Sequence, residues 1–191
     1  FLLMSATLGD VAFFQDELTR RTGRPTAVVD DAVRPVPLRF EYHRTLLHHT
    51  VEELLAQDAA QLYIVNFSQK DAVAQASALA SVTKLDERGK AIVAEELSQA
   101  KLPAGFGRDL ARLLRNGVGV HHAGILPRYK QLVEKLTLDR LLKFVVSTET
   151  ISAGINLPAR RVVFPELRKY VQKKARLLTS AEYHQMAGRA G

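Results

Sequence analysis

Short apolar runs alternate with longer amphipathic stretches along most of the chain. The apolar runs predict strands at residues 62–67, 118–121, 142–147 and 161–164. The stretches around them predict helices over residues 51–57, 69–82, 87–100, 107–115 and 127–140, and a last helix from Ser180. Strands of four to six apolar residues that are separated by helices indicate right-handed crossovers and a parallel sheet. We therefore expect an α/β fold.

The first fifty residues follow a different pattern. Residues 1–4 predict the end of a buried strand, and a helix over residues 10–21 follows, with Asp10 in the capping position. Extended runs at 26–30 and 36–43 come next, and two prolines near their junction disfavour helix. This part of the chain therefore indicates a linker ahead of the α/β domain.

Polar residues and helix caps follow the ends of the predicted strands. Residues 68–71 (Ser-Gln-Lys-Asp) and 179–182 (Thr-Ser-Ala-Glu) both have the spacing of a capping box. Ligands of open α/β sheets bind beyond the carboxyl ends of the strands. We therefore expect Ser68, residues 121–124, the segment from Thr148 and the last helix to gather at one edge of the sheet.

The composition fits one ordinary globular domain with at most a flanking piece. The 191 residues are 47% hydrophobic and 25% charged, and the mean hydropathy is −0.07. No apolar stretch reaches the roughly 18 residues that a membrane-spanning helix needs, so we expect no membrane partner. The sequence has no cysteine, which excludes disulfides, thiol nucleophiles and thiolate zinc sites and is compatible with a reducing cytoplasm.

Basic residues gather in the second half of the chain. Residues 1–107 carry 11 Lys and Arg against 14 Asp and Glu, whereas residues 108–191 carry 16 against 6, so the net charges are −3 and +10. Seven of the basic residues lie between Arg160 and Arg176. A basic half is expected of a protein that binds a polyanion, and an ordinary solvated surface explains it about as well.

Two segments carry residue types that suit ligand binding. In residues 145–158 a strand ends in hydroxyl residues, and a glycine and Asn156 follow. In residues 182–191, Gln185 and Arg189 lie four residues apart on one helical face, and small neighbours give the guanidinium room to reach a phosphate. Alone, the first segment is only suggestive, and the second is more typical of a helix end.

Five segments, taken in chain order, resemble the motifs of the DExH-box helicases of superfamily two. They are Ser5–Thr7, Phe67–Lys70, Val118–Pro127, Thr148–Pro158 and Gln185–Gly191. In that family these segments look like motifs III, IV, IVa, V and VI. The match is most similar to the Ski-two-like branch, which includes exosome-associated RNA helicases and archaeal repair DNA helicases. A chance match to one segment is plausible, whereas a match to all five in order is not.

The resemblance implies three parts of the chain. Residues 1–9 would end the first, ATP-binding RecA-like domain, residues 10–50 would be an extended linker, and residues 51–191 would be a second RecA-like domain truncated within motif VI. The second domain is expected to be a RecA-like helicase C-terminal domain, a parallel sheet with helices on both faces. Since the chain has neither a starting methionine nor a basic leader, we expect a fragment of a longer protein.

Nucleic-acid binding is implied for residues of motifs IV, IVa and V. They are Ser68, Gln69, His121, His122, Gly124, Arg128, Thr148 and Thr150. Ser68 and Gln69, on the first turn of a capped helix, would face a phosphate, although a plain N-cap explains them nearly as well. The paired histidines have no acidic or cysteine partner at ligand spacing, so we expect no metal site.

The resemblance also implies residues that act on the nucleotide. Ser5 and Thr7 would couple the nucleotide state to the grip on the strand, unless they form an ordinary strand-to-helix turn. The residues that would approach the nucleotide are Gly154, Asn156 and Gly188. Gln185 and Arg189 would be catalytic and point at the γ-phosphate, with Arg189 as an arginine finger.

Two motifs of an ATP-hydrolysing helicase are missing from this sequence. It has no Gly-x-x-x-x-Gly-Lys-Ser/Thr loop and no Asp-Glu-x-His box. We therefore expect ATP and Mg²⁺ to be held mainly by the absent first RecA-like domain, in cis, and this chain alone to be inactive. Residues 165–176 depart from the family pattern, with Pro165 and the pair Val171-Gln172 where other residues are expected, so their conformation is open.

The sequence thus predicts part of a cytoplasmic ATP-dependent helicase that moves 3′ to 5′ along single-stranded or 3′-overhang RNA or DNA. A non-catalytic nucleic-acid-binding module with the same fold is the alternative. A dehydrogenase-type nucleotide-binding domain is disfavoured, because no Gly-x-Gly-x-x-Gly follows any predicted strand. Contacts to the strand backbone carry little base information, so both RNA and DNA stay open as substrates.

Overall fold

The structure is a computed structural model that describes residues 1–5, 10–29, 36–57, 61–103, 105–149, 159–172 and 174–190. Its helices are α1 (Ala12–Thr22), α2 (Leu47–Ala56), α3 (Gln69–Leu79), α4 (Glu87–Ala100), α5 (Phe106–Arg115), α6 (Pro127–Leu138) and α7 (Ser180–Ala187). Its strands are β1 (Leu62–Asn66), β2 (Val118–His121), β3 (Phe144–Thr148), β4 (Arg161–Val163), β5 (Arg168–Val171) and β6 (Lys174–Leu177). Among the described residues, no helix has the length and apolar content that crossing a membrane requires.

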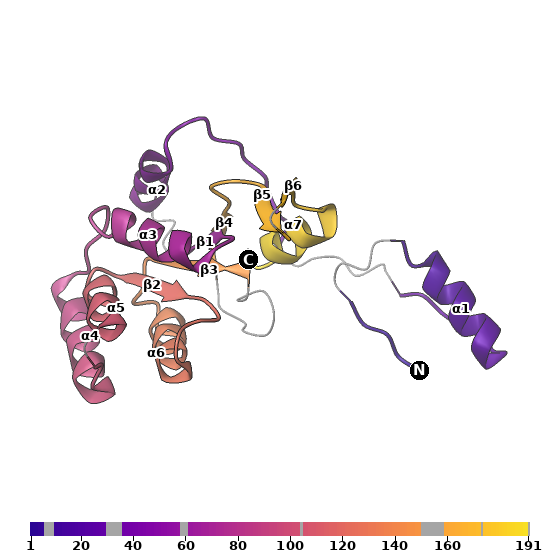
Figure 1. Ribbon diagram of the computed structural model, residues 1–191, viewed down its shortest axis with the longest axis horizontal. Coiled ribbons are helices and arrows are strands. Elements are labelled where there is room, and N and C mark those ends of the chain that lie inside the picture. Colours follow the sequence, from indigo (N-terminus) through magenta and orange to yellow (C-terminus); the bar gives the residue numbers. More distant parts are fainter. Residues whose placement is uncertain are drawn as a thin grey trace.

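Four strands of the described part of the chain form a parallel sheet in the order β2-β3-β1-β4. The step from β1 to β2 and the step from β2 to β3 run in opposite directions across this sheet. Right-handed crossovers therefore place α3 and α6 on opposite faces, which agrees with their positions in Figure 1. This arrangement confirms the predicted α/β class, a parallel sheet with helices on both faces.

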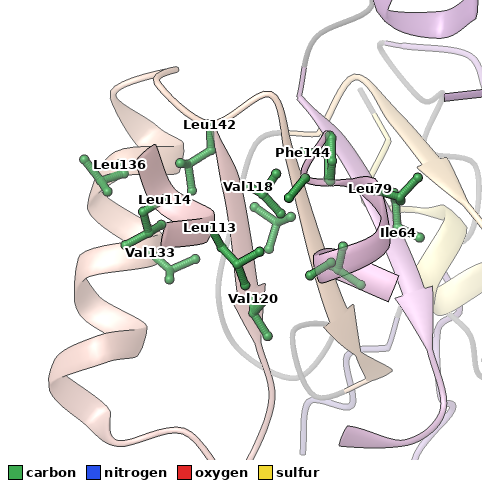
Figure 2. Packing of buried hydrophobic residues seen from close by; sticks show 14 of the residues in the cluster. Ile64, Leu79, Leu113, Leu114, Val118, Val120, Val133, Leu136, Leu142 and Phe144 are labelled. Atoms are coloured by element: carbon green, nitrogen blue, oxygen red, sulfur yellow. The ribbon is translucent and has the colours of Figure 1, made fainter. Parts of the chain in front are cut away.

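The strands bury side chains on both faces, as parallel strands between layers of helices do. Every residue of β1, β2 and β3 is buried. Phe144, at the start of β3, is the largest of the described side chains that are fully buried. Leu114 of α5 and Leu136 of α6 pack beside Val118 and Leu142 (Figure 2). Removal of this apolar surface from water is the main contribution to the stability of the domain.

Some predicted element boundaries are confirmed and others shift. The helix over 87–100 and the strand over 118–121 have the predicted bounds. The helix predicted from residue 51 begins at Leu47 instead. Its N-cap residue, Leu46, makes no side-chain cap, so the sequence carries no start signal at this position.

The prediction of a buried strand at the N-terminus is wrong in this structure. Residues 1–5 form no strand, and the side chains of Phe1, Leu2 and Met4 are exposed. A strand is stable only beside a partner that satisfies its backbone groups, and none of the described strands pairs with this segment.

The helix predicted after this segment is present as α1. None of its residues, all of which are described, is buried. The N-cap of α1 is Val11 rather than the predicted Asp10, but Asp10 accepts a hydrogen bond from the Ala12 N–H at 2.9 Å. Figure 1 shows α1 apart from the sheet. Both α1 and the first residues of α2 fall within the predicted linker of residues 10–50.

An antiparallel hairpin of β5 and β6 lies beside α7 (Figure 1), and the sequence pattern does not predict it. Arg168 pairs with Leu177, and Gln172 in the turn has a φ of 50°. Exposed basic residues on both strands hide the alternation that marks a half-buried strand. The hairpin gives a defined conformation to most of the segment 165–176, whose conformation the sequence leaves open.

Candidate functional site

The carboxyl ends of three strands meet at one edge of the parallel sheet. His121 of β2 is in register with Ser147 of β3, and Asn66 of β1 is in register with Thr148 of β3. The segments that follow β1 and β2 start from this edge. The structure therefore brings together strand-end residues that the sequence pattern predicts to gather there.

The segments after β1 and β2 touch each other. Ser68 caps α3, because its Oγ accepts a hydrogen bond from the Asp71 N–H at 3.0 Å. The next side chain, Gln69, lies against Gly124, where an added Cβ would overlap with Gln69 Oε1. Glycine is the residue that permits this close approach without displacing the glutamine. Gln69 and Gly124 are both exposed, so together they form a continuous surface beyond β1 and β2.

His121 and His122 are buried at the end of β2. His121 Nε2 lies 3.1 Å from Glu134 Oε1 of α6, and His122 Nδ1 accepts a hydrogen bond from the Gly124 N–H at 3.2 Å. Burial lowers the pKa of both imidazoles, and Glu134 partly opposes this effect at His121. Both rings are therefore neutral near pH 7, and their contact with a nucleic-acid strand stays a prediction.

Buried polar atoms without partners concentrate at the same edge. Asn66 Nδ2, His121 Nδ1 and His122 Nε2 have no hydrogen-bond partner within the described residues. Buried polar groups are almost always paired in folded proteins. Three such atoms at neighbouring strand ends distinguish this edge from the rest of the described molecule.

A buried tyrosine holds the end of β3. Tyr63 Oη donates to the Thr148 carbonyl oxygen at 3.3 Å and lies 3.4 Å from Ser147 Oγ. Burial raises the pKa of Tyr63 to about 12, and the contact with Ser147 and the positive charge of Arg189 partly oppose this shift. The backbone beside Arg189 is placed by a bridge between Ala190 and Ala159, which lies just before β4.

Helix α7 is fixed at both ends, and Arg189 follows it. A capping box links Thr179 and Glu182 at the start of the helix, and Met186 near its end is buried in the core. Gln185 is exposed. Arg189 is partly buried in the turn after the helix, where its N–H donates to the Met186 carbonyl oxygen at 3.1 Å. The predicted pair is thus one turn apart, with only Gln185 inside the helix.

Four charged side chains tie the hairpin to α7 and to the end of β3. Lys169 Nζ lies 2.8 Å from Glu149 Oε2 and 2.7 Å from Glu182 Oε1. Arg176 makes a bidentate pair with Glu182 at 2.6 and 2.8 Å. The hydrogen bonds from Arg176 hold the pKa of Glu182 well below its ordinary value, against the opposing effect of burial. Burial alone would lower the pKa of Lys169, but its bonds to the two glutamates raise it.

Replacing Glu182 by glutamine is expected to lower the melting temperature of this chain at pH 7 by about 2–4 °C, or about 1 kcal/mol, since the carboxylate is partly exposed and screened. Glutamine can still complete the capping box, and it removes the charge together with one of the two acceptor oxygens. Because the folded-state pKa of Glu182 lies below the ordinary value of 4.5, its stabilisation is present above about pH 4.5 and is lost as the pH falls further. Thermal unfolding from pH 7 to pH 3 measures this dependence.

The matched control for this change is Glu87→Gln on α4. Glu87 forms an exposed ion pair with Lys90 at 2.6 Å, so the same change of charge there is expected to alter the melting temperature less. A difference between the native chain and the Glu182→Gln variant that persists undiminished at pH 3 would contradict the assignment of the stabilisation to the carboxylate.

The other predicted site residues fall into two groups. Ser5 is exposed in the N-terminal segment. Arg128 is exposed at the start of α6, with its guanidinium carbon 5.1 Å from the centre of the Tyr129 ring, and Gly188 is the C-cap of α7. The remaining predicted residues lie outside the described part of the chain: Thr7, Thr150, Gly154 and Asn156.

Sequence reasoning misses three residues that shape this site, namely Tyr63, Glu149 and Lys169. Tyr63 lies in an apolar run and is interpreted as part of the core. Lys169 is one of seven basic residues between 160 and 176, and composition does not separate a buried lysine from solvated ones. The signal that does exist is the capping box, which marks Glu182 but not its partners.

Comparison with known proteins identifies relatives of this chain. No family model matches it. It is 38% identical over 153 residues to the exosome RNA helicase MTR4 of Homo sapiens, which covers 74% of this chain and 14% of that protein. It is 35% identical over 212 residues to the ATP-dependent DNA helicase Hel308 of Pyrobaculum calidifontis, which covers 100% of this chain and 29% of that protein.

A third relative matches a shorter stretch at higher identity. The chain is 54% identical over 82 residues to the DExH-box ATP-dependent RNA helicase DExH11 of Arabidopsis thaliana, which covers 43% of this chain and 6% of that protein. This chain therefore spans less than a third of the length of each of these three relatives.

Proposed function

Because this chain belongs to the Ski-two-like branch of the DExH-box helicases of superfamily two, we propose that it is the second RecA-like domain of an ATP-dependent helicase. The observation that carries the proposal is the shared sheet edge, where Gln69 after β1 lies against Gly124 after β2 and both strands are in register with β3 up to its end. Such edges are where ligands bind in α/β folds. The parent enzyme would couple ATP hydrolysis to movement along one strand.

Arg189 would supply positive charge to the γ-phosphate during hydrolysis. Its planar guanidinium matches phosphate oxygens, and its small neighbours Gly188 and Ala190 leave it room. The buried Met186 and the bridge between Ala159 and Ala190 hold the backbone on both sides of the arginine. A donor that is fixed before the reaction needs little reorganisation when negative charge develops.

We propose that ATP and Mg²⁺ are held mainly by a first RecA-like domain in cis. The guanidinium of Arg189 and the amide of Gln185 suit the oxygens of a phosphate rather than a cation, and the described residues contain no group of three or more potential metal ligands. Mg²⁺ neutralises charge on the β- and γ-phosphates when it is bound. The residues of the second domain that would approach the nucleotide are Gly188, Gly154 and Asn156.

Strand binding would use the surface beyond β1 and β2. Gln69 and Gly124 lie side by side there, and the exposed Arg128 follows at the start of α6. The neutral, buried His121 and His122 would act through the backbone that they hold in place. The further predicted strand contacts are Ser68, Thr148 and Thr150. Contacts of this type address phosphates and sugars, so RNA and DNA both fit, and the direction of 3′ to 5′ follows from the family.

The proposed domain organisation assigns residues 1–9 to the end of the first domain, 10–50 to a linker and 51–191 to the second domain. The bare surface of α1 supports it, because a short helix with no buried face gains little stability by itself. Ser5 and Thr7 would couple the two domains. The cytoplasm stays a prediction from the cysteine-free sequence.

A non-catalytic nucleic-acid-binding module is the alternative function. Two observations favour the ATP-dependent helicase over this alternative. The relatives reported above all carry helicase names, and an arginine held in the turn after α7 has a use in phosphate chemistry that a passive module would not need.

The isolated chain is expected to bind single strands weakly, with little sequence preference and with strong salt dependence. If it neutralises about three phosphates, the logarithm of the affinity should fall with the logarithm of the salt concentration at a slope near −2. Fluorescence anisotropy with labelled RNA and DNA single strands measures this slope. Salt concentrations of about 50 to 200 mM suit the titration, because the affinity of phosphate contacts changes strongly over this range. An affinity that does not change with salt would contradict backbone contact and favour a protein partner for the basic half.

The proposed function itself is tested with a longer protein that contains this chain and a first RecA-like domain. We expect ATP-dependent unwinding of RNA or DNA duplexes that carry 3′ overhangs, and none of duplexes that carry only 5′ overhangs. Matched RNA and DNA duplexes in the same assay identify the preferred substrate. Strand binding without any ATP-dependent unwinding or strand-stimulated hydrolysis would support the non-catalytic alternative.

A further inference from the structure

The hairpin of β5 and β6 is anchored by a lysine. Among its described residues, Lys169 is the only buried one, at 8% exposure, while Arg168, Tyr170 and Val171 around it are exposed. A leucine would anchor a hairpin of this kind without the cost of taking a charge out of water. The burial of an ammonium group therefore points to its charged partners.

Lys169 stands in the middle of an alternating chain of charges. Glu149 and Glu182 lie on either side of its ammonium group at 2.8 and 2.7 Å, and Arg176 closes the chain on Glu182. Glu182 also accepts a hydrogen bond from the Thr179 N–H at 2.9 Å, which makes it part of the start of α7. A displacement of Glu149 thus reaches the first turn of α7 through a single side chain.

The two glutamates belong to segments with different proposed tasks. Glu149 directly follows Thr148, a proposed strand contact at the end of β3. Glu182 lies in the first turn of α7, and Arg189 lies in the turn that follows the end of this helix. Helix α7 has eight residues and moves as a rigid element, so a movement of its first turn also shifts the turn that carries Arg189. Since Lys169 is itself buried, its ammonium group is not available for direct contact with a nucleic acid.

We propose that Lys169 is a positioning residue that couples strand occupancy at the end of β3 to the placement of Arg189. This inference rests on the proposed function. Strand binding moves the segment of Thr148 and Glu149, and the ion pair with Glu149 moves Lys169 with it. The second ion pair of Lys169, with Glu182, transmits this movement to α7. The surface of the hairpin is not required for this role, because the coupling passes through Lys169, the buried side chain among the described residues of the hairpin.

The test uses a longer protein that contains this chain and a first RecA-like domain. The readout is the ratio of ATP turnover with saturating single strand to ATP turnover without strand. Lys169→Met keeps an unbranched apolar stem and removes the charge, and we expect it to lower this ratio at least about fivefold, the lower range of allosteric coupling between two sites. A merely structural loss would lower both rates in proportion and leave the ratio unchanged.

Two further variants sharpen the result. Glu149→Gln leaves the cap of α7 and the pair of Lys169 with Glu182 in place, and it should lower the ratio to a similar extent. The double variant should be no worse than either single one, because both changes cut the same connection. Lys90→Met, which removes a lysine from the exposed pair with Glu87 on α4, is the matched control and should leave the ratio at the native value.

Binding gives an independent check by reciprocity. A non-hydrolysable ATP analogue changes the strand affinity of the native protein by some factor, and Lys169→Met should bring that factor close to one. A native ratio of stimulated to unstimulated turnover in Lys169→Met and Glu149→Gln would overturn the inference while leaving the proposed function intact. A native protein that shows no stimulation by any strand would instead contradict the proposed function, and the inference with it.

Discussion

Replacement of Arg189 by alanine, in a longer protein that contains this chain and a first RecA-like domain, is expected to lower ATP turnover about 10³-fold. The reason is the loss of a donor that is held in the turn after α7 by its own backbone hydrogen bond to Met186. Lysine keeps the positive charge but lacks the planar fork, so Arg189→Lys should still impair turnover. Steady-state ATP hydrolysis at saturating single strand measures the effect.

Strand affinity in the absence of nucleotide separates this role from one in strand binding. We expect it to stay within about threefold of the native value in both variants, because the guanidinium is proposed to face the γ-phosphate. Arg112→Ala, which removes an exposed arginine from α5, is the matched control and should change neither quantity. Near-normal turnover together with lost strand binding would contradict this assignment, because it would show that Arg189 contacts the strand and not the γ-phosphate.

The isolated chain is expected to hydrolyse no ATP, whether or not nucleic acid is present. The sequence lacks the Gly-rich loop that holds the phosphates and the acidic box that supplies the magnesium ligand and the catalytic base. An arginine finger without these groups has no positioned phosphate to act on. Mg²⁺-dependent phosphate release by the purified chain, compared with the longer protein at equal concentration, measures the difference.

The control for this experiment is the Arg189→Ala variant of the isolated chain. Any trace turnover that the native and variant chains share is due to a contaminating enzyme. Turnover that survives repurification, scales with the polypeptide and falls in the variant would contradict the expectation that the chain is inactive alone.

The parallel sheet can be predicted from the sequence because each of its central strands is a short apolar run. Residues 118–121 include the apolar Val118 and Val120, and α6 follows after five residues with Pro127 at its first position. The N-terminal run of residues 1–4 has the same apolar character but forms no strand. The apolar pattern reports that a segment can be buried, and it does not report whether partner strands are present.

The candidate site is predictable where residues follow strand ends and not where contacts join distant segments. The crowding of Ser68, Gly124 and Thr148 follows from the topology of any parallel sheet. The ion pairs of Lys169 with two glutamates depend on a hairpin whose strands are basic and exposed. Glu149 precedes Lys169 by 20 residues and Glu182 follows it by 13, so these pairs join distant segments. Nothing in the local sequence encodes which of several lysines is buried.

The chain's central role is tested most directly by a structure of the longer protein with a strand and a transition-state analogue of ATP hydrolysis. The account predicts that the guanidinium of Arg189 lies within hydrogen-bond distance, about 2.7–3.2 Å, of the oxygens that represent the transferred γ-phosphoryl group. It also predicts that the strand lies over Gln69 and Gly124. An Arg189 side chain directed away from the analogue, or a strand bound elsewhere than at this sheet edge, would contradict it.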